Sequence, residues 1–317
     1  MRSAILITLL SLSLTACGKG AATKDTPADG RSASAASASS GAMAPAPEPV
    51  PDTLTVTVAP LAVGAKSEET SSDELKFKLT IDLSPKPAID FTQTETRASV
   101  TRTEIMATDG KATTKARVTY VSDKKVVTKD GKDQSPPVNP RVGKTFVLEL
   151  KDGKLVITDE KGKKAGKKED AEVRRDNAHF GQPDPMTAAL PSTPLKVGDK
   201  IPALGTALDQ YFKDHDDGKK SKNAMAVSGV EVKLASVETP GPDAVGVFAI
   251  TLTAGSPKDT KEIISLQMPL QGTMKVRARD GRILQIALGG PMTMTGTDPK
   301  TKISGGGDFK LTATTTY

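Results

Sequence analysis

Apolar and polar side chains alternate with a period of two along much of the chain after residue 52. Leu75, Phe77, Leu79 and Ile81, for example, are separated by single Lys or Thr residues. This alternation is typical of strands that bury one face. We expect strands within residues 54–58, 75–81, 91–107, 117–127, 146–150, 155–157, 224–237, 245–254, 262–268, 274–278, 284–288, 292–296 and 308–317.

One segment, residues 203–215, has the spacing of a helix, because one helical face carries Leu204, Ala207, Leu208, Tyr211 and His215. Residues 161–177 are highly charged and fit either a loop or a second, exposed helix. Short connections between the strands favour antiparallel pairing. We predict a mainly β fold, a curved antiparallel sheet (half-barrel-like) with one or two packed helices. The pattern leaves both a half-barrel and a sandwich open.

Two Asp-Gly pairs predict turns between strands. At Asp152-Gly153, a two-residue loop would pair Lys151 with Lys154 and place the apolar residues of both strands on one face, as in a tight primed turn. At the second pair, residues 280–281, a two-residue loop would separate the apolar faces, because a slip of one residue reverses every side chain. We expect a three-residue loop there, in a bulged or longer hairpin.

The N-terminus follows another pattern. Arg2 precedes an apolar run over residues 4–14, which has the length of a signal peptide and is short of the roughly 20 residues that span a bilayer. The run leads into Leu14-Thr15-Ala16-Cys17, and the chain contains 1 cysteine in total. No disulfide can therefore form within the chain.

The sequence Leu14-Thr15-Ala16-Cys17 resembles the lipobox of bacterial lipoproteins, in which two small residues separate a Leu from the Cys. The resemblance implies that residues 1–16 are a signal peptide recognised through Leu14, Thr15 and Ala16. It also implies that a diacylglycerol is attached to the sulfur of Cys17, because a thiolate is a strong nucleophile. Two or three acyl chains would then anchor the mature protein stably to a membrane.

The residue after the cysteine bears on the destination of such a lipoprotein. In Gram-negative members of the family, an Asp after the Cys tends to retain the protein at the inner membrane. The residue here is Gly18. For a Gram-negative source, the resemblance therefore implies an outer-membrane anchor, with the body of the protein facing the periplasm.

Residues 17–52 are rich in Ala, Ser, Gly, Pro and Thr, and Pro stands at alternate positions over residues 45–51. Such a segment cannot bury enough apolar area to offset its ordering entropy, and alternating Pro favours extended conformations. We predict three parts: a signal peptide over 1–16, a lipidated N-terminus with a disordered tether over 17–52, and a β-rich folded domain over 53–317.

Composition narrows the range of partners. Aromatic residues make up 3% of the chain and Trp is absent, which leaves few surfaces for stacking on bases. We therefore expect no nucleic-acid partner. The net charge of +6 favours anionic surroundings such as lipid head groups, but acids and bases are interleaved along most of the chain. The lysine-rich run at residues 161–168 fits either contact with lipid phosphates or a solvated loop.

A search for catalytic and metal motifs finds none. His179 and His215 each lack a second histidine or a cysteine at ligand spacing, so no zinc site is expected. There is no Gly-x-Ser-x-Gly motif and no phosphate-binding loop, and we expect the glycine run at residues 305–307 to form a turn. Any two of the 38 acidic residues could still meet in space. We expect no metal, no cofactor and no enzymatic activity.

Residues 190–201 contain a Pro-flanked strand followed by Val197-Gly198-Asp199. This stretch resembles one in uncharacterised β-rich envelope lipoproteins, in which an aromatic residue usually stands at the position of Ile201. The expected half-barrel also resembles periplasmic lipoprotein-carrier proteins, which is an analogy of fold.

Three hypotheses about function follow from these patterns. The first is a non-enzymatic envelope lipoprotein that binds a hydrophobic or lipid ligand. The second is a structural or partner-binding envelope module without a cavity, and the third is a hydrolytic enzyme with a site that the sequence does not reveal. An apolar pocket larger than about 300 Å³ would favour the first hypothesis. A filled core with a broad exposed apolar patch would favour the second, and a cleft with converging carboxylates or His179 would favour the third.

Overall fold

The computed structural model describes residues 52–82, 87–215, 226–239, 241, 243–256, 264–296 and 302–317. The predicted signal peptide, Cys17 and the tether up to residue 51 lie outside the described residues. Within the described residues, no helix is long and apolar enough to cross a membrane.

An antiparallel sheet of 11 strands makes up most of the fold. Its strands are β2 (Lys66–Asp82), β3 (Ile89–Thr108), β4 (Thr113–Lys129), β5 (Lys132–Asp133), β6 (Thr145–Lys151), β7 (Lys154–Asp159), β9 (Ala226–Glu238), β10 (Val245–Gly255), β11 (Ile264–Arg277), β12 (Arg282–Gly296) and β13 (Lys302–Thr316). The order across the sheet is β7-β6-β4-β3-β2-β13-β12-β11-β10-β9, with β5 beside β4. A separate pair joins β1 (Thr53–Leu54) to β8 (Leu195–Lys196).

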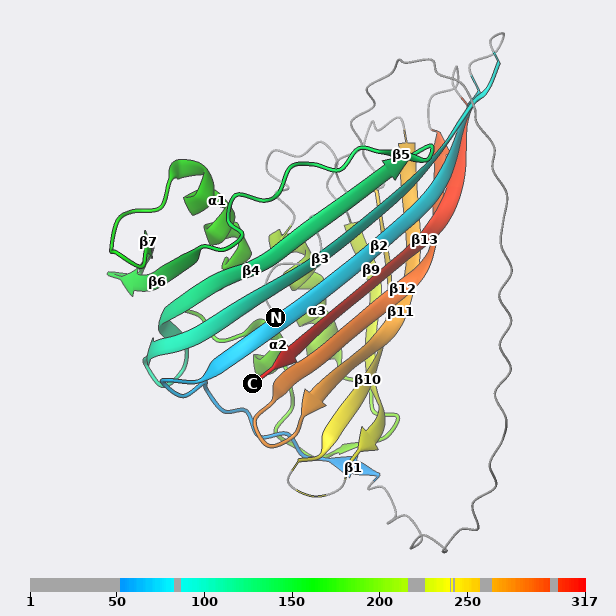
Figure 1. Ribbon diagram of the computed structural model, residues 1–317. Coiled ribbons are helices and arrows are strands. Elements are labelled where there is room, and N and C mark those ends of the chain that lie inside the picture. Colours follow the sequence, from blue (N-terminus) through cyan, green and yellow to red (C-terminus); the bar gives the residue numbers. More distant parts are fainter. Residues whose placement is uncertain are drawn as a thin grey trace, which may run out of the picture. The chain divides into compact units, whose positions relative to one another are not determined.

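The large sheet is open and curved, with β7 and β9 at its two ends (Figure 1). The C-terminal strand β13 lies in the middle of the sheet, beside the N-terminal strand β2. Helices α2 (Pro185–Ala188) and α3 (Pro202–His215) lie behind the sheet in Figure 1, on its concave side. The prediction of a mainly β fold with a curved antiparallel sheet and helices packed on one side is confirmed, and a sandwich of two sheets is not what forms.

The predicted helix is confirmed as α3. Leu204, Leu208 and Tyr211 are buried against the sheet, and the side chain of His215 lies outside the described residues. The charged segment at 161–177 contains a further helix, α1 (Lys167–Asp176). Val173 on α1 is fully buried, so this helix is packed as well as charged.

The inward side chains form two apolar clusters. The larger cluster joins β9 to β13 and part of β2 with α2 and α3, and its fully buried members include Leu79, Leu204, Leu234, Phe248, Met274 and Met294. The smaller cluster joins β3, β4, β6 and β7 with α1, and consists of Ile105, Ala116, Val118, Tyr120, Phe146, Leu148, Ile157, Val173 and Phe180. Burial of these side chains is the main source of stability for each part of the sheet.

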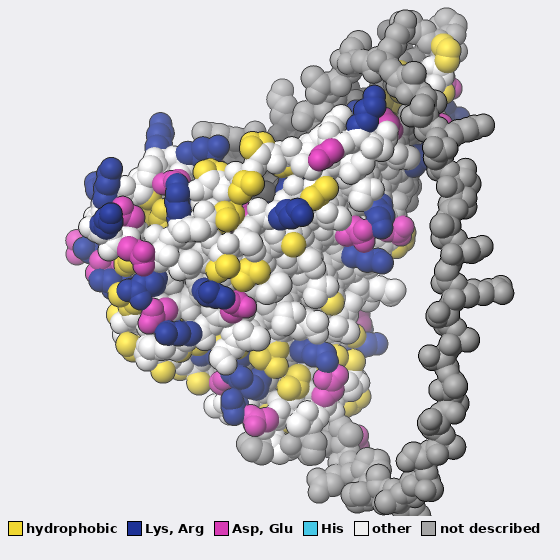
Figure 2. Space-filling model, viewed as in Figure 1, with side chains coloured by type: hydrophobic (Ala, Val, Ile, Leu, Met, Phe, Trp, Pro, Cys, Tyr) yellow, Lys and Arg dark blue, Asp and Glu magenta, His cyan; other side chains and the backbone are white. Residues whose placement is uncertain are grey.

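The convex face of the sheet carries mixed polar side chains (Figure 2). On β2, outward positions such as Lys76 and Lys78 alternate with the buried Leu75 and Phe77. Positive and negative groups are interspersed over this face, and Arg102, for example, forms an ion pair of 2.6 Å with Glu68. This face has the composition of a surface in contact with water.

The two Asp-Gly turns differ, as the apolar pattern predicts. Lys151 pairs with Lys154, which confirms the tight hairpin at Asp152-Gly153. At the second turn, Arg277 pairs with Arg282, so the loop has four residues, 278–281. The prediction of a bulged or longer hairpin is confirmed, but the expected three-residue loop is wrong. A bulge at Leu284 then restores the alignment, since it lets Val276 face Ile283 and Met274 face Ile286.

The glycine run at residues 305–307 lies inside β13, so the expected turn is wrong. Each of these glycines pairs with a residue on both neighbouring strands. A Cβ atom at Gly307 would collide with the backbone carbonyl of Lys76 on β2. The run therefore permits a close approach of strands in the middle of the sheet.

The stretch at residues 190–201 places β8 before a turn that leads to α3. The carboxylate of Asp199 accepts a hydrogen bond of 2.7 Å from the backbone N–H of Lys196, which closes the turn around Gly198. Gly198 has a φ of +97°, a conformation that favours glycine. Ile201 is buried in the larger apolar cluster.

Candidate functional site

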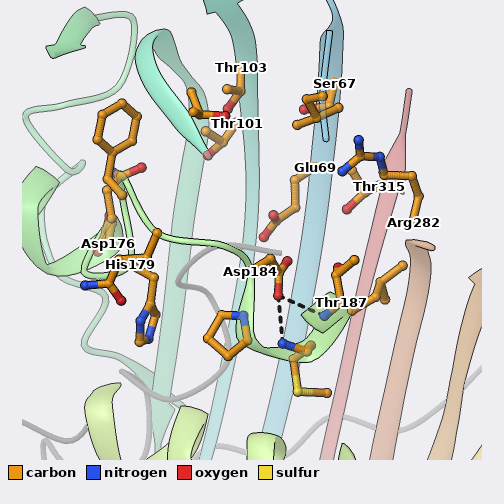
Figure 3. A pocket seen from close by; sticks show the side chains of 18 of the residues that line it. Ser67, Glu69, Thr101, Thr103, Asp176, His179, Asp184, Thr187, Arg282 and Thr315 are labelled. Atoms are coloured by element: carbon orange, nitrogen blue, oxygen red, sulfur yellow. Dashed lines mark hydrogen bonds between the residues drawn. The ribbon is translucent and has the colours of Figure 1, made fainter. Parts of the chain in front are cut away.

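A cavity of about 450 Å³ lies on the concave side of the sheet. Its walls come from β2, β3, β4, β12, β13 and α3, from the loop at residues 110–112, and from two segments that cross the sheet, residues 58–61 and 176–188 (Figure 3). Members of both apolar clusters line it, for example Ile286 of the larger cluster and Val118 of the smaller one. The cavity therefore separates the two regions in which the core is packed.

One wall of the cavity is apolar. It consists of the inward side chains of β12 together with side chains from α2 and α3, namely Ile283, Ile286, Leu288, Met186, Leu208 and Tyr211. All six are buried members of the larger cluster. This wall can contact an apolar ligand without leaving a polar group unpaired.

A second wall, formed by β13, β2 and β3 beside β12, carries hydroxyl groups. It consists of Ser67 on β2, Ser99, Thr101 and Thr103 on β3, and Thr315 on β13. Side chains on a strand alternate between faces, and the odd-numbered residues of β2 and β3 point inward here. The same alternation that buries Leu75 and Phe91 therefore directs this row of hydroxyl groups into the cavity (Figure 3).

The hydroxyl wall ends at a buried ion pair. Arg97 donates two hydrogen bonds to the carboxylate of Asp123, of 2.8 Å from Nε and 2.7 Å from Nη2, and the side chain of Asn139 donates a third of 2.7 Å. Burial alone would raise the pKa of Asp123. The hydrogen bonds and positive charge of Arg97 outweigh burial, and the pKa lies below its ordinary value.

A second ion pair connects the cavity to α1. The guanidinium of Arg141 contacts the carboxylate of Asp176, and its Nε lies 3.1 Å from Oε2 of Glu172. The guanidinium carbon also lies over the Tyr120 ring, 4.6 Å from the ring centre. Burial raises the pKa of Asp176, and the charge of Arg141 offsets this only in part. Burial and the adjacent Asp176 carboxylate also raise the pKa of the Tyr120 phenol. Both buried arginines are thus neutralised by carboxylates.

The segment from Asp176 to Ala188 crosses the concave side between α1 and α2. Phe180 anchors one end in the smaller cluster, and Met186 anchors the other end in the larger cluster. Asp184 caps α2, because its carboxylate accepts backbone hydrogen bonds of 2.9 Å from Met186 and 3.3 Å from Thr187 (Figure 3). These contacts hold the segment across the cavity.

A shorter segment from Thr57 to Ala65 crosses the same side of the sheet. The N–H of Thr57 donates to the carbonyl of Ala278 at 2.8 Å, and the N–H of Gly64 donates to the carbonyl of Ile105 at 2.8 Å. Arg282 adds a hydrogen bond of 2.7 Å from its guanidinium to the carbonyl of Ala59. The segment therefore bridges the two halves of the sheet along one side of the cavity.

The predicted site residues fall into separate places. Leu14, Thr15, Ala16 and Cys17 lie outside the described residues. His179 lies in a loop, as expected, but its side chain is half-buried and lines the cavity. The lysines of residues 161–168 are exposed around the start of α1, and the cavity lining does not include them.

Apart from His179, sequence reasoning did not identify the cavity residues. They come from several strands and two crossing segments, and the only signal in the sequence is the replacement of apolar by polar residues at the inward positions of β3. Within the described residues, no group of three His, Cys, Asp or Glu side chains is placed to hold a metal ion.

No protein-family model and no curated protein sequence matches the chain. Among solved structures, one is of lipovitellin, described by its lipid–protein interactions. The match is 8% identical in sequence and has a TM-score of 0.31. It covers 79% of this chain and 25% of the lipovitellin chain. Another is Ail, the attachment invasion locus protein of Yersinia pestis, with 6% identity and a TM-score of 0.12. That match covers 80% of this chain and 98% of the Ail chain. At these scores the likenesses carry no argument about function.

Proposed function

We propose that the chain is a membrane-anchored bacterial envelope lipoprotein whose cavity binds a hydrophobic or lipid ligand. The observation that carries the ligand part of this proposal is the cavity of about 450 Å³ between two packed apolar clusters. Ligand sites are typically concavities of about 300–1,000 Å³ with apolar walls and a few placed polar groups. The wall formed by β12, α2 and α3 provides the apolar surface.

The lipobox-like sequence supports the anchoring part of the proposal. Acyl chains on Cys17 would hold the protein at a membrane, and Gly18 favours the outer membrane facing the periplasm in a Gram-negative source. Intact mass measurement of protein purified from the envelope tests this. We expect a mass without residues 1–16 and with added acyl groups, and a Cys17→Ser control without either change. An unmodified full-length mass would contradict the anchor.

A binding role is favoured over an enzymatic one by the acidic groups beside His179. Asp176 contacts Arg141 and accepts a hydrogen bond of 3.4 Å from Tyr120, and Asp184 caps α2. These carboxylates hold the protein structure together, whereas a general base must be available to a substrate proton. A partner-binding module is the alternative function, and an empty cavity in the experiment below would favour it.

Native mass spectrometry tests the ligand directly. The chain from Gly18 to Tyr317, which keeps every described residue, would be produced in bacteria and purified without detergent. We expect an additional mass that organic extraction identifies as lipid. A bare protein mass, together with failure to take up added lipids, would overturn the proposed ligand function.

A further inference from the structure

We infer that the ligand of this cavity is an amphiphile with an anionic oxygen head group, a carboxylate or a phosphate, bound by Arg282 and Thr315. This inference rests on the proposed ligand-binding function. It concerns the part of the cavity where the start of β12 lies near the end of β13 and the start of β2 (Figure 3).

Thr315 supplies a buried hydroxyl group. Its side chain points inward from β13, opposite Glu69 of β2, and the residue is 5% exposed. The hydroxyl oxygen is buried and has no hydrogen-bond partner among the described protein atoms. Buried hydroxyl groups in folded proteins nearly always bond to protein or to ordered water, so this one is placed to bond with a polar ligand atom or with water in the cavity.

Arg282 supplies the positive charge. Its guanidinium donates one hydrogen bond of 2.7 Å to the carbonyl of Ala59 and lies 5.7 Å from the centre of the Tyr317 ring. It forms no ion pair with a described residue, whereas the other two arginines that line the cavity, Arg97 and Arg141, are paired with carboxylates. The remaining N–H groups of Arg282 are therefore available to a ligand.

The position of Arg282 at the start of β12 also fixes the direction of the ligand. Ile283, Ile286 and Leu288 come after it in the same strand and point inward, and all three line the cavity together with Arg282. An amphiphile with its head group at Arg282 would place its apolar tail along these side chains. Arginine suits this role because its planar guanidinium binds carboxylate and phosphate groups with two parallel hydrogen bonds.

Glu69 is an acidic side chain of the lining in this part of the cavity (Figure 3). The carboxylate of Asp280, which Arg277 binds, also lies near Arg282. A carboxylate near the head group repels an anion, so Glu69 weakens the binding of such a ligand. This predicts an effect of opposite sign for two neighbouring substitutions. Removing the charge of Arg282 should weaken anion binding, and removing the charge of Glu69 should strengthen it.

Binding of two amphiphiles that differ only in the head group tests the inference. Palmitate and 1-hexadecanol would be titrated by displacement of a neutral fluorescent probe from the chain Gly18–Tyr317. We expect palmitate to bind about tenfold more tightly than the alcohol, in line with a charge-assisted hydrogen bond. Arg282→Gln should remove this preference and leave hexadecanol binding within about twofold, and Arg282→Lys should keep part of the preference.

Three further variants complete the comparison. Thr315→Val, which keeps the side-chain shape, should weaken palmitate binding about threefold, and Glu69→Gln should strengthen it. Arg102→Gln removes an exposed arginine from the convex side and should change nothing. Equal binding of the two amphiphiles, or an Arg282→Gln variant that retains the preference, would overturn the inference and leave the proposed ligand function standing.

A different result would overturn the proposed function itself. If neither palmitate nor hexadecanol binds and purified protein carries no lipid, the cavity is not a lipid site. If palmitate is preferred, titration with palmitoyl lysophosphatidic acid identifies the source of the anionic group. Tighter binding of the lysophospholipid supports a phospholipid head group, and tighter binding of palmitate supports a fatty acid.

Discussion

The strands β3 and β12 lie in the same sheet and face the same side, but their inward side chains differ. On β12 these are Ile283, Ile286, Leu288, Met292 and Met294, all buried in the larger cluster. On β3, the inward positions between Phe91 and Ile105 are Gln93, Glu95, Arg97, Ser99, Thr101 and Thr103. The comparison teaches that the half of the concave face around β12 is apolar, whereas the half around β3 has a polar centre beside the smaller apolar cluster. Arg97, Ser99, Thr101 and Thr103 of this polar half line the cavity.

The polar half is stabilised in a different way from the apolar half. Its charged groups form ion pairs between neighbouring strands. Arg97 pairs with Asp123, and Nζ of Lys125 lies 2.6 Å from a carboxylate oxygen of Glu95. Replacing a buried ion pair by packed apolar side chains often leaves stability unchanged or higher. The paired charges of this half therefore need an explanation other than stability, and a ligand site provides one.

The largest effect is expected in the apolar half. Phe248 on β10 is 0% exposed and belongs to the larger cluster. Phe248→Ala should lower the free energy of unfolding by about 3–5 kcal/mol, because it removes apolar contacts and leaves a cavity. Thr101→Ala on the polar half should lower it by less than about 0.5 kcal/mol. Urea titration measures both, and equal losses would contradict the division of the concave face.

A smaller effect is expected from breaking a charge pair of the polar half. Arg97→Met should lower the free energy of unfolding by about 3 kcal/mol, because Asp123 would remain buried with its charge uncompensated. The exposed pair Arg102 and Glu68 on the convex face is the control, and Arg102→Met should cost at most about 1 kcal/mol. The double substitution Arg97→Met and Asp123→Leu should recover most of the loss. A loss equal to that of the surface pair would contradict this account.

The smallest expected effect is a change in the dependence of stability on pH. The pKa of Asp123 is lowered in the folded protein. Its contribution to the free energy of unfolding is therefore present above about pH 3.8 and is lost as the pH falls through its folded pKa. Asp123→Asn should therefore show a weaker loss of stability between pH 5 and pH 2 than the wild type. Thermal unfolding across this range measures it.

Asp176 gives the opposite control for this prediction. Its pKa is raised in the folded protein, so its contribution is present below about pH 3.8 and is lost as the pH rises through its folded pKa. Asp176→Asn should therefore make the loss of stability at acid pH steeper than in the wild type. The same slope in both variants would show that neither carboxylate titrates as its surroundings indicate.

The sequence predicts the strands and the main helix well, because their apolar residues repeat with the period of each element. The spacing of Leu204, Leu208 and Tyr211 matches α3, and alternation locates most strands. The second hairpin was only partly predicted. Its bulge at Leu284 shifts the register by one residue, and no local feature of the sequence distinguishes that bulge from a three-residue loop.

The cavity was not predictable to the same degree. The alternation on β3 indicates a strand, but it does not reveal that Thr101 and Thr103 face inward, since exposed polar faces give the same pattern. Similarly, the glycine run in β13 resembles a turn locally, and its role depends on β2, which lies more than 200 residues earlier in the chain. A site formed by distant strands becomes visible only in the assembled sheet.

The most direct test of the central claim is to fill the cavity and follow the ligand. Thr101→Trp places a large side chain in the cavity, and Thr92→Trp places the same side chain on the exposed face of the same strand. Native mass spectrometry of both variants and the wild type measures the fraction of protein with bound lipid. We predict bound lipid in the wild type and in Thr92→Trp, and its loss in Thr101→Trp. Equal occupancy in Thr101→Trp and the wild type would contradict binding in this cavity.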